Sequence, residues 1–100
     1  MPSLSMSVAH GLDQEGATRR LKDRFDAIKE TYREHIHGLQ EAWEQNVLTF
    51  GFTTFGVAVR GKVTAEPSEV KVVAELPLTA MIFKGTIEKQ IRDELSRILA

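Results

Sequence analysis

Residues 48–76, LTFGFTTFGVAVRGKVTAEPSEVKVVAEL, decide the fold of this chain. Apolar residues alternate with polar ones along three consecutive segments of this stretch. The alternating apolar positions are Leu48, Phe50 and Phe52, then Val57, Val59, Gly61 and Val63, then Val70, Val72, Ala74 and Leu76. Many of the positions between them carry charged or hydroxyl side chains, including Arg60, Lys62, Thr64, Lys71 and Glu75. This period of two predicts three antiparallel strands with one covered face and one face in water.

Short turns join these strands into a meander. If Trp43 pairs with Leu48, residues 39–44 form a further strand and Gln45-Asn46 forms its two-residue turn. Turns at Phe55-Gly56 and Pro67-Ser68 then set the pairs Phe52–Val59, Phe50–Gly61, Val63–Val72 and Gly61–Ala74. Every pair keeps its side chains on the covered face. A slip of one residue would turn the apolar side chains of a strand to the open face. The registers are therefore consistent with one another.

The rest of the chain predicts one more strand and two helices. Residues 4–10 alternate in the same way and end at Gly11. Asp13 is a typical helix N-cap, and apolar residues recur at helical spacing to about His35, with Gly38 as the terminating glycine. A second stripe predicts a helix from residue 86 onward, made of Ile87, Ile91, Leu95 and Ile98. Residues 78–84, which precede Gly85, form either the first turns of that helix or a separate kinked turn.

Both helical stripes need the single covered face of the sheet. We therefore expect a two-layer α+β fold of order β-α-β-β-β-β-α, one domain over residues 1–100, with both helices on one face of a five-stranded, mainly antiparallel sheet. The expected strand order is 2-3-4-5-1, and the alternative pairs the first strand with the second in parallel. The arrangement resembles a reduced helix-grip domain, in which a curved sheet wraps a C-terminal helix around an apolar pocket. The deepest burial is expected for Phe25, Phe50, Val59, Val72, Ile87 and Ile91.

Composition excludes several classes of protein. The 100 residues are 42% hydrophobic and 27% charged, as in ordinary globular domains, and the formal net charge is -1. Nucleic-acid binding normally needs a basic excess, so we expect no nucleic-acid partner. The absence of cysteine excludes disulfides, thiol chemistry and thiolate metal sites. The start of the chain lacks the features of a signal peptide, and no apolar run reaches the ~20 residues of a membrane span, so we expect a cytoplasmic protein.

Histidines and one glutamate are the candidates for chemistry. His35 and His37 stand two residues apart, point in different directions on a helix and lack a cysteine partner, so we expect no metal and no cofactor. His10 ends a strand on its apolar face, where a hydrogen bond at the rim of the core satisfies a histidine. Glu41 falls on the covered face near Phe50. A carboxyl group held there in apolar surroundings acts as an acid or base; on an edge strand it reaches water past the helix, and a bulge turns it outward.

Two apolar features exceed what a simple core needs. Trp43 is either a core residue or a platform for a ligand. The interaction patch, Leu78, Met81, Ile82 and Phe83, has more apolar surface than a single helical stripe hides. If the helix that contains Ile87 extends back through this segment, its spacing turns Phe83 towards the core and leaves Met81 and Ile82 near the flank or outside. The patch serves as extra core, as a dimer contact or as an attachment to an apolar surface.

One protein family shows a similar set of residues from Trp43 to the end of the chain. They are Trp43, Leu48, Phe50, Phe55-Gly56-Val57, Gly61, Val63, Val70, Val72, Leu76, Phe83-Lys84-Gly85, Ile87, Ile91 and Leu95. On these residues the chain resembles the polyhydroxyalkanoic acid system proteins, small bacterial proteins encoded in polyhydroxyalkanoate granule gene regions. That family usually has a Gly-Asp turn after the tryptophan, where this chain has Glu44-Gln45-Asn46. The resemblance implies an association with polyester storage granules and carries over no catalytic residue.

The leading hypothesis is a non-enzymatic accessory protein, cytoplasmic or bound to the surface of a storage granule. It acts through the interaction patch, as a homodimer or on the polyester surface or granule proteins. The alternative is a small-molecule binding module of the helix-grip type that holds an acyl-like ligand, with Glu41, Trp43, Phe50 and His10 as candidate ligand-binding residues. A hydrolase or isomerase that uses Glu41 ranks third, because no second acid, nucleophile or oxyanion donor can be placed beside it.

Overall fold

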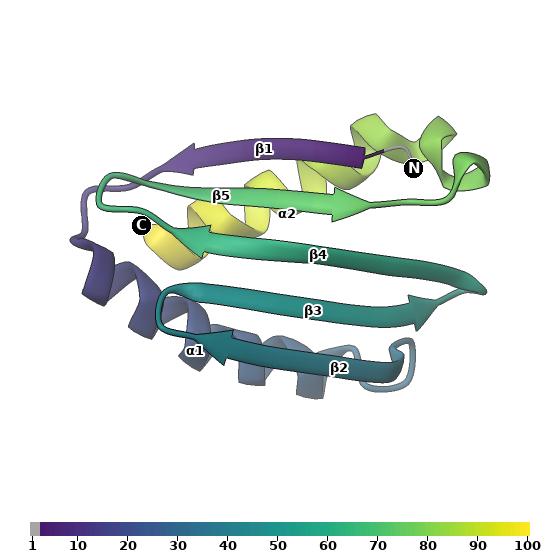
Figure 1. Ribbon diagram of the computed structural model, residues 1–100, viewed down its shortest axis with the longest axis horizontal. Helices are drawn as coiled ribbons and strands as arrows, with labels where there is room; N and C mark the ends of the chain where they lie inside the picture. Colours follow the sequence, from purple (N-terminus) through teal and green to yellow (C-terminus); the bar gives the residue numbers. More distant parts are fainter. Residues whose placement is uncertain (1–2) are drawn as a thin grey trace.

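Five strands form one sheet in the computed structural model, which describes residues 3–100 (Figure 1). They are β1 (Ser3–Ala9), β2 (His37–Glu44), β3 (Val47–Thr54), β4 (Val57–Ala65) and β5 (Glu69–Glu75). Their order is β1-β5-β4-β3-β2 and every neighbouring pair is antiparallel. The predicted strand order is therefore confirmed, and the parallel alternative for β1 is excluded. Met1 and Pro2, at the start of the segment in which we expect no signal peptide, lie outside the described residues.

The predicted registers are confirmed. The pairs Trp43–Leu48, Phe52–Val59, Phe50–Gly61, Val63–Val72 and Gly61–Ala74 all occur. Gly61 is required at its position, because a Cβ atom there would lie 2.8 Å from Cζ of Phe50 and closer still to the carbonyl oxygen of Val73. The ring of Phe50 therefore lies over the one residue of β4 that leaves room for it.

The turn between β3 and β4 has an unusual composition. Phe55 and Gly56 both have positive φ, 49° and 76°, as a two-residue turn of type I′ requires. Glycine adopts this conformation freely, whereas for a residue with a side chain it is unfavourable in free energy. Phe55 is also 83% exposed, and its ring stacks on His35 with 5.4 Å between the ring centroids. Stability alone does not favour a phenylalanine in this turn.

Two α-helices cover the same face of the sheet, as predicted (Figure 1). They are α1 (Gln14–Thr31) and α2 (Lys84–Leu99), and the 3-10 helix η1 (Leu78–Phe83) precedes α2. Asp13 caps α1, since its side chain accepts a hydrogen bond from the N–H of Gly16. The expected end of α1 near His35 is wrong, because the helix stops at Thr31. Gly38 does not terminate it either; Gly38 lies in the edge strand β2 with a φ of 61°, beside a shift in register.

The core is concentrated under α2 and the first half of α1. Its buried residues include Leu4, Ala17, Leu21, Val70, Val72, Leu76, Leu95 and Ile98. The predicted deep burial is correct for Val72, which is 3% exposed. It is wrong for five others, Phe25, Phe50, Val59, Ile87 and Ile91, all of which keep part of their surface exposed.

The partial exposure has a structural cause, because the two helices do not close over the sheet. At one end they are tied together, since the guanidinium group of Arg20 donates hydrogen bonds to the carbonyl oxygens of Ile98, at 3.2 Å, and Ala100. At the other end they diverge: α1 lies beside β2, where Lys29 contacts Glu41, while α2 starts from η1 and packs on β1 (Figure 1). A strip of the covered face, formed by β3 and β4, is left between them.

Candidate functional site

An apolar cleft lies between α1, α2 and the strip of β3 and β4 that the helices leave uncovered; we call it the helix cleft. Its volume is about 410 Å³, within the range of roughly 300–1,000 Å³ that is usual for small-molecule sites. Its walls include Phe25 and Ile28 from α1, Phe50 and Val59 from the sheet, and Ile91 from α2. Three polar residues, Thr54, Gln90 and Glu94, complete the lining.

Trp43 and Phe50 both line the helix cleft, so two of the four candidate ligand-binding residues come together. Trp43 is half-buried and packs against the core cluster. The ammonium group of Lys22 lies 5.2 Å from the centroid of its ring. The indole is thus at once a part of the core and a part of the cleft wall.

Glu41 is not among the residues that line the helix cleft. It lies opposite Phe50 in the β2–β3 ladder, and its Oε1 atom lies 2.5 Å from Nζ of Lys29 on α1. Nζ of Lys29 also lies 3.1 Å from a carboxylate oxygen of Asp26. Hydrogen bonds to Glu41 and Asp26 raise the pKa of Lys29 above its ordinary value of 10.5. Glu41 is therefore a paired carboxylate on the edge strand, at the flank of α1.

His10 is not among the residues that line the helix cleft; it directly follows β1, which ends at Ala9. Its Nδ1 atom accepts a hydrogen bond from the N–H of Leu12 at 3.1 Å. Its Nε2 atom lies 2.9 Å from the carbonyl oxygen of Glu66, to which it donates, since a neutral imidazole that accepts at one nitrogen carries its proton on the other. The imidazole thus links the start of α1 to the β4–β5 turn, at the rim of the core.

Five large apolar side chains are exposed at one end of the molecule, which we call the apolar end. They are Tyr32 (49% exposed), Phe55 (83%), Leu78 (76%), Ile82 (82%) and Phe83 (56%). They belong to the end of α1, the β3–β4 turn and η1, which all lie towards the right-hand end of Figure 1, with η1 at the top and the end of α1 at the bottom. The sequence reasoning missed Tyr32 and Phe55. An aromatic residue at a turn position that normally takes Asn, Asp or Gly was the available signal for Phe55.

The expected arrangement of the interaction patch needs one correction. As expected, Met81 lies at the flank, partly buried against a core cluster that includes Leu76 and Ala80, and Ile82 lies outside, 82% exposed. Phe83 does not turn inward but is 56% exposed. Residues 78–83 form a 3-10 helix with three residues per turn, so they do not continue the 3.6-residue phase of α2.

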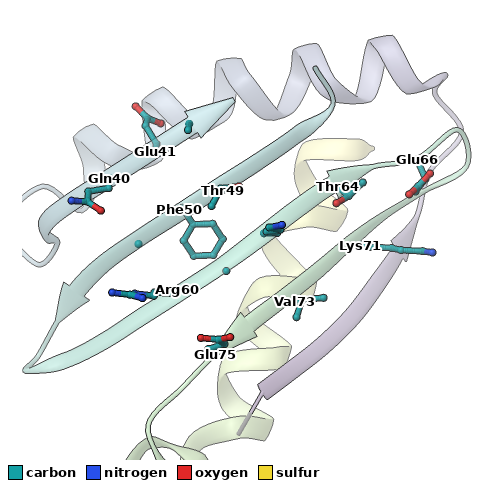
Figure 2. A pocket seen from close by; sticks show the side chains of 14 residues that line it. Gln40, Glu41, Thr49, Phe50, Arg60, Thr64, Glu66, Lys71, Val73 and Glu75 are labelled. Atoms are coloured by element: carbon teal, nitrogen blue, oxygen red, sulfur yellow. The ribbon is translucent and has the colours of Figure 1, made fainter. Parts of the chain in front are cut away.

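The open face of the sheet carries a second, larger hollow of about 800 Å³ (Figure 2). Basic and acidic side chains are mixed along it: Arg60 pairs in register with Glu75, and Lys71 lies 3.7 Å from Glu69. Between residues 3 and 100, no three His, Asp or Glu side chains are grouped as a metal site would need. Over the same residues, no helix is long and apolar enough to cross a membrane.

Comparison with known protein families gives one match. The model of the family described as "Putative polyhydroxyalkanoic acid system protein" covers residues 4–99. This range includes β1 and α1, which precede the stretch that carries the resemblance in the sequence. Comparisons with curated proteins and with solved structures found no match. Because the family model spans nearly the whole chain, this protein belongs to the polyhydroxyalkanoic acid system protein family.

Proposed function

We propose that this protein is a non-catalytic accessory protein of the polyhydroxyalkanoate system that attaches to the surface of the polyester through its apolar end. The observation that carries the proposal is the one-sided placement of exposed apolar residues. Of the six large hydrophobic residues that are exposed among residues 3–100, only Val73 lies away from that end. Family membership supports a polyester as the apolar material.

The form of the apolar end favours a surface over a second copy of the chain. Its side chains come from three separate segments around one end of a molecule 37 Å long. A stable protein interface buries about 1,200–2,000 Å² of closely matched surface. Separate protruding side chains instead suit a deformable apolar surface, such as a polyester, into which each side chain can insert. Each large apolar side chain removed from water contributes about 1.5–3 kcal/mol, so the three residues of η1 supply a useful part of the binding energy.

The test is co-sedimentation with hydroxyalkanoate polyester particles. We expect the wild type to bind and the triple variant Leu78→Ser/Ile82→Ser/Phe83→Ser to bind at least about tenfold more weakly. Met81 is left unchanged because it packs in the core. Val73→Thr is the matched control, since Val73 is 46% exposed but lies in β5, away from the apolar end.

Two results would contradict the proposal. One is equal binding of particles by the wild type and by a triple variant that circular dichroism shows to be folded. The other is a wild type that sediments as a dimer without particles, does not bind them, and becomes a monomer in the triple variant. In that case the apolar end is a protein interface.

A further inference from the structure

The helix cleft is a space that packing has left open. Phe25, Phe50, Val59 and Ile87 line it and keep part of their surface exposed, although they lie on the covered side of the sheet. Protein interiors normally contain few voids larger than a water molecule. A cleft of about 410 Å³ lined mainly by apolar side chains is far larger than such voids, and a ligand that fills it removes apolar surface from water.

The charges around the helix cleft disfavour an anionic ligand. None of the described residues that line it is basic, and its one charged residue, Glu94, is acidic and lies 3.4 Å from the guanidinium group of Arg97. Lys29 lies nearby, with its ammonium group 5.4 Å from the ring centroid of Phe25, but it is already paired with Glu41 and Asp26. An ionised carboxylate taken from water without a partner pays a large desolvation cost.

The polar residues of the lining favour a ligand with hydrogen-bond acceptors. The hydroxyl group of Thr54 and the side-chain amide of Gln90 can both donate. An aliphatic ester combines an apolar chain with carbonyl acceptors and carries no charge. The helices α1 and α2, which wall the cleft, diverge towards the apolar end (Figure 1).

We infer that the helix cleft binds one segment of an uncharged aliphatic ester chain. The alkyl part lies against Phe25, Phe50, Val59 and Ile91, and ester carbonyls accept hydrogen bonds from Thr54 or Gln90. The inference rests on the proposed function, since a polyester chain at the apolar end has this chemistry. Its test uses soluble ligands, so that the inference about the cleft and the proposed attachment to polyester can fail separately.

Trp43 provides the readout, because it is the only tryptophan and it lines the cleft. We expect its fluorescence emission to change saturably on titration with methyl octanoate. Octanoate at pH 8 is expected to bind at least about tenfold more weakly, because its carboxylate finds no cation in the lining. Equal affinity for octanoate, or no saturable response to the ester, would overturn the inference.

A matched pair of variants tests the location of the site. Val59→Phe fills the cleft from β4, and Val73→Phe makes the same change on the open face of the neighbouring strand β5. We expect ester binding to weaken at least about tenfold in Val59→Phe and to stay unchanged in Val73→Phe. If Val59→Phe does not fold, Ile87→Phe makes the test from α2. If the folded cleft variant binds the ester with the same affinity as the wild type, the ligand lies elsewhere and the inference is overturned.

The two proposals are separated by exchanging the assays. The triple serine variant of η1 is expected to keep ester binding and lose particle binding, whereas Val59→Phe is expected to do the reverse. Particle binding by the wild type without ester binding overturns the inference about the cleft alone. Ester binding without particle binding supports it and overturns the proposed function alone.

Discussion

Phe55 is unfavourable for folding stability but suited to contact with an apolar surface. Its φ of 49° lies in the left-handed region, where a residue with a side chain pays about 1–2 kcal/mol. Its side chain is 83% exposed, so it gains little burial in return. Unfavourable conformations that persist are often found where a protein binds a partner. A contact between Phe55 and an apolar surface accounts for both observations.

At this scale we predict that Phe55→Asn raises the free energy of unfolding by about 0.5–2 kcal/mol, because Asn-Gly is the preferred sequence of this turn type. The same change is expected to weaken binding to polyester particles. Urea unfolding measures the first effect and co-sedimentation measures the second. A less stable variant would mean that the stacking of Phe55 on His35 outweighs the cost of its backbone conformation.

At the scale of elements, α2 is attached unevenly along its length. Leu95 and Ile98 are 7% and 5% exposed, whereas Ile87, near the start of the helix, is only partly buried. We predict that Leu95→Ala lowers the free energy of unfolding by about 2–5 kcal/mol. Ile87→Ala is expected to cost less than about 1.5 kcal/mol, because Ile87 is only partly buried and its truncation removes less packing. Equal losses in chemical denaturation would mean that the helices close over the sheet in solution.

The strands could be predicted from the sequence because each wrong register would invert a face. The ends of the helices could not. Tyr32 continues the helical spacing of Leu21, Phe25 and Ile28, but it is 49% exposed and offers too little packing to extend the helix past Thr31. Residues 78–83 have no regular period of their own, and Gly85 lies inside α2 rather than before it. Glycine marked this boundary to within two residues, since α2 begins at Lys84 and residues 78–83 form a separate turn, one of the two forms expected.

At the scale of the whole molecule, the helix cleft was the feature that the sequence could not reveal. Apolar stripes indicate which faces meet, and they correctly placed both helices on one side of the sheet. They do not give the angle between the helices. That angle depends on contacts between distant parts of the chain, such as the hydrogen bond from Arg20 to Ile98. Residues whose alternation predicts burial, such as Phe50 and Val59, therefore line the helix cleft instead.

The central claim is that the molecule meets the polyester with its apolar end. The chain has no cysteine, so a single new one can carry a polarity-sensitive dye. Thr79→Cys places the dye on η1, and Ser68→Cys places it in the β4–β5 turn at the opposite end (Figure 1). When polyester particles are added, the emission of the dye at residue 79 is expected to shift to the blue, while the dye at residue 68 stays unchanged. Equal shifts at both positions, or a shift at residue 68 alone, would contradict the claim.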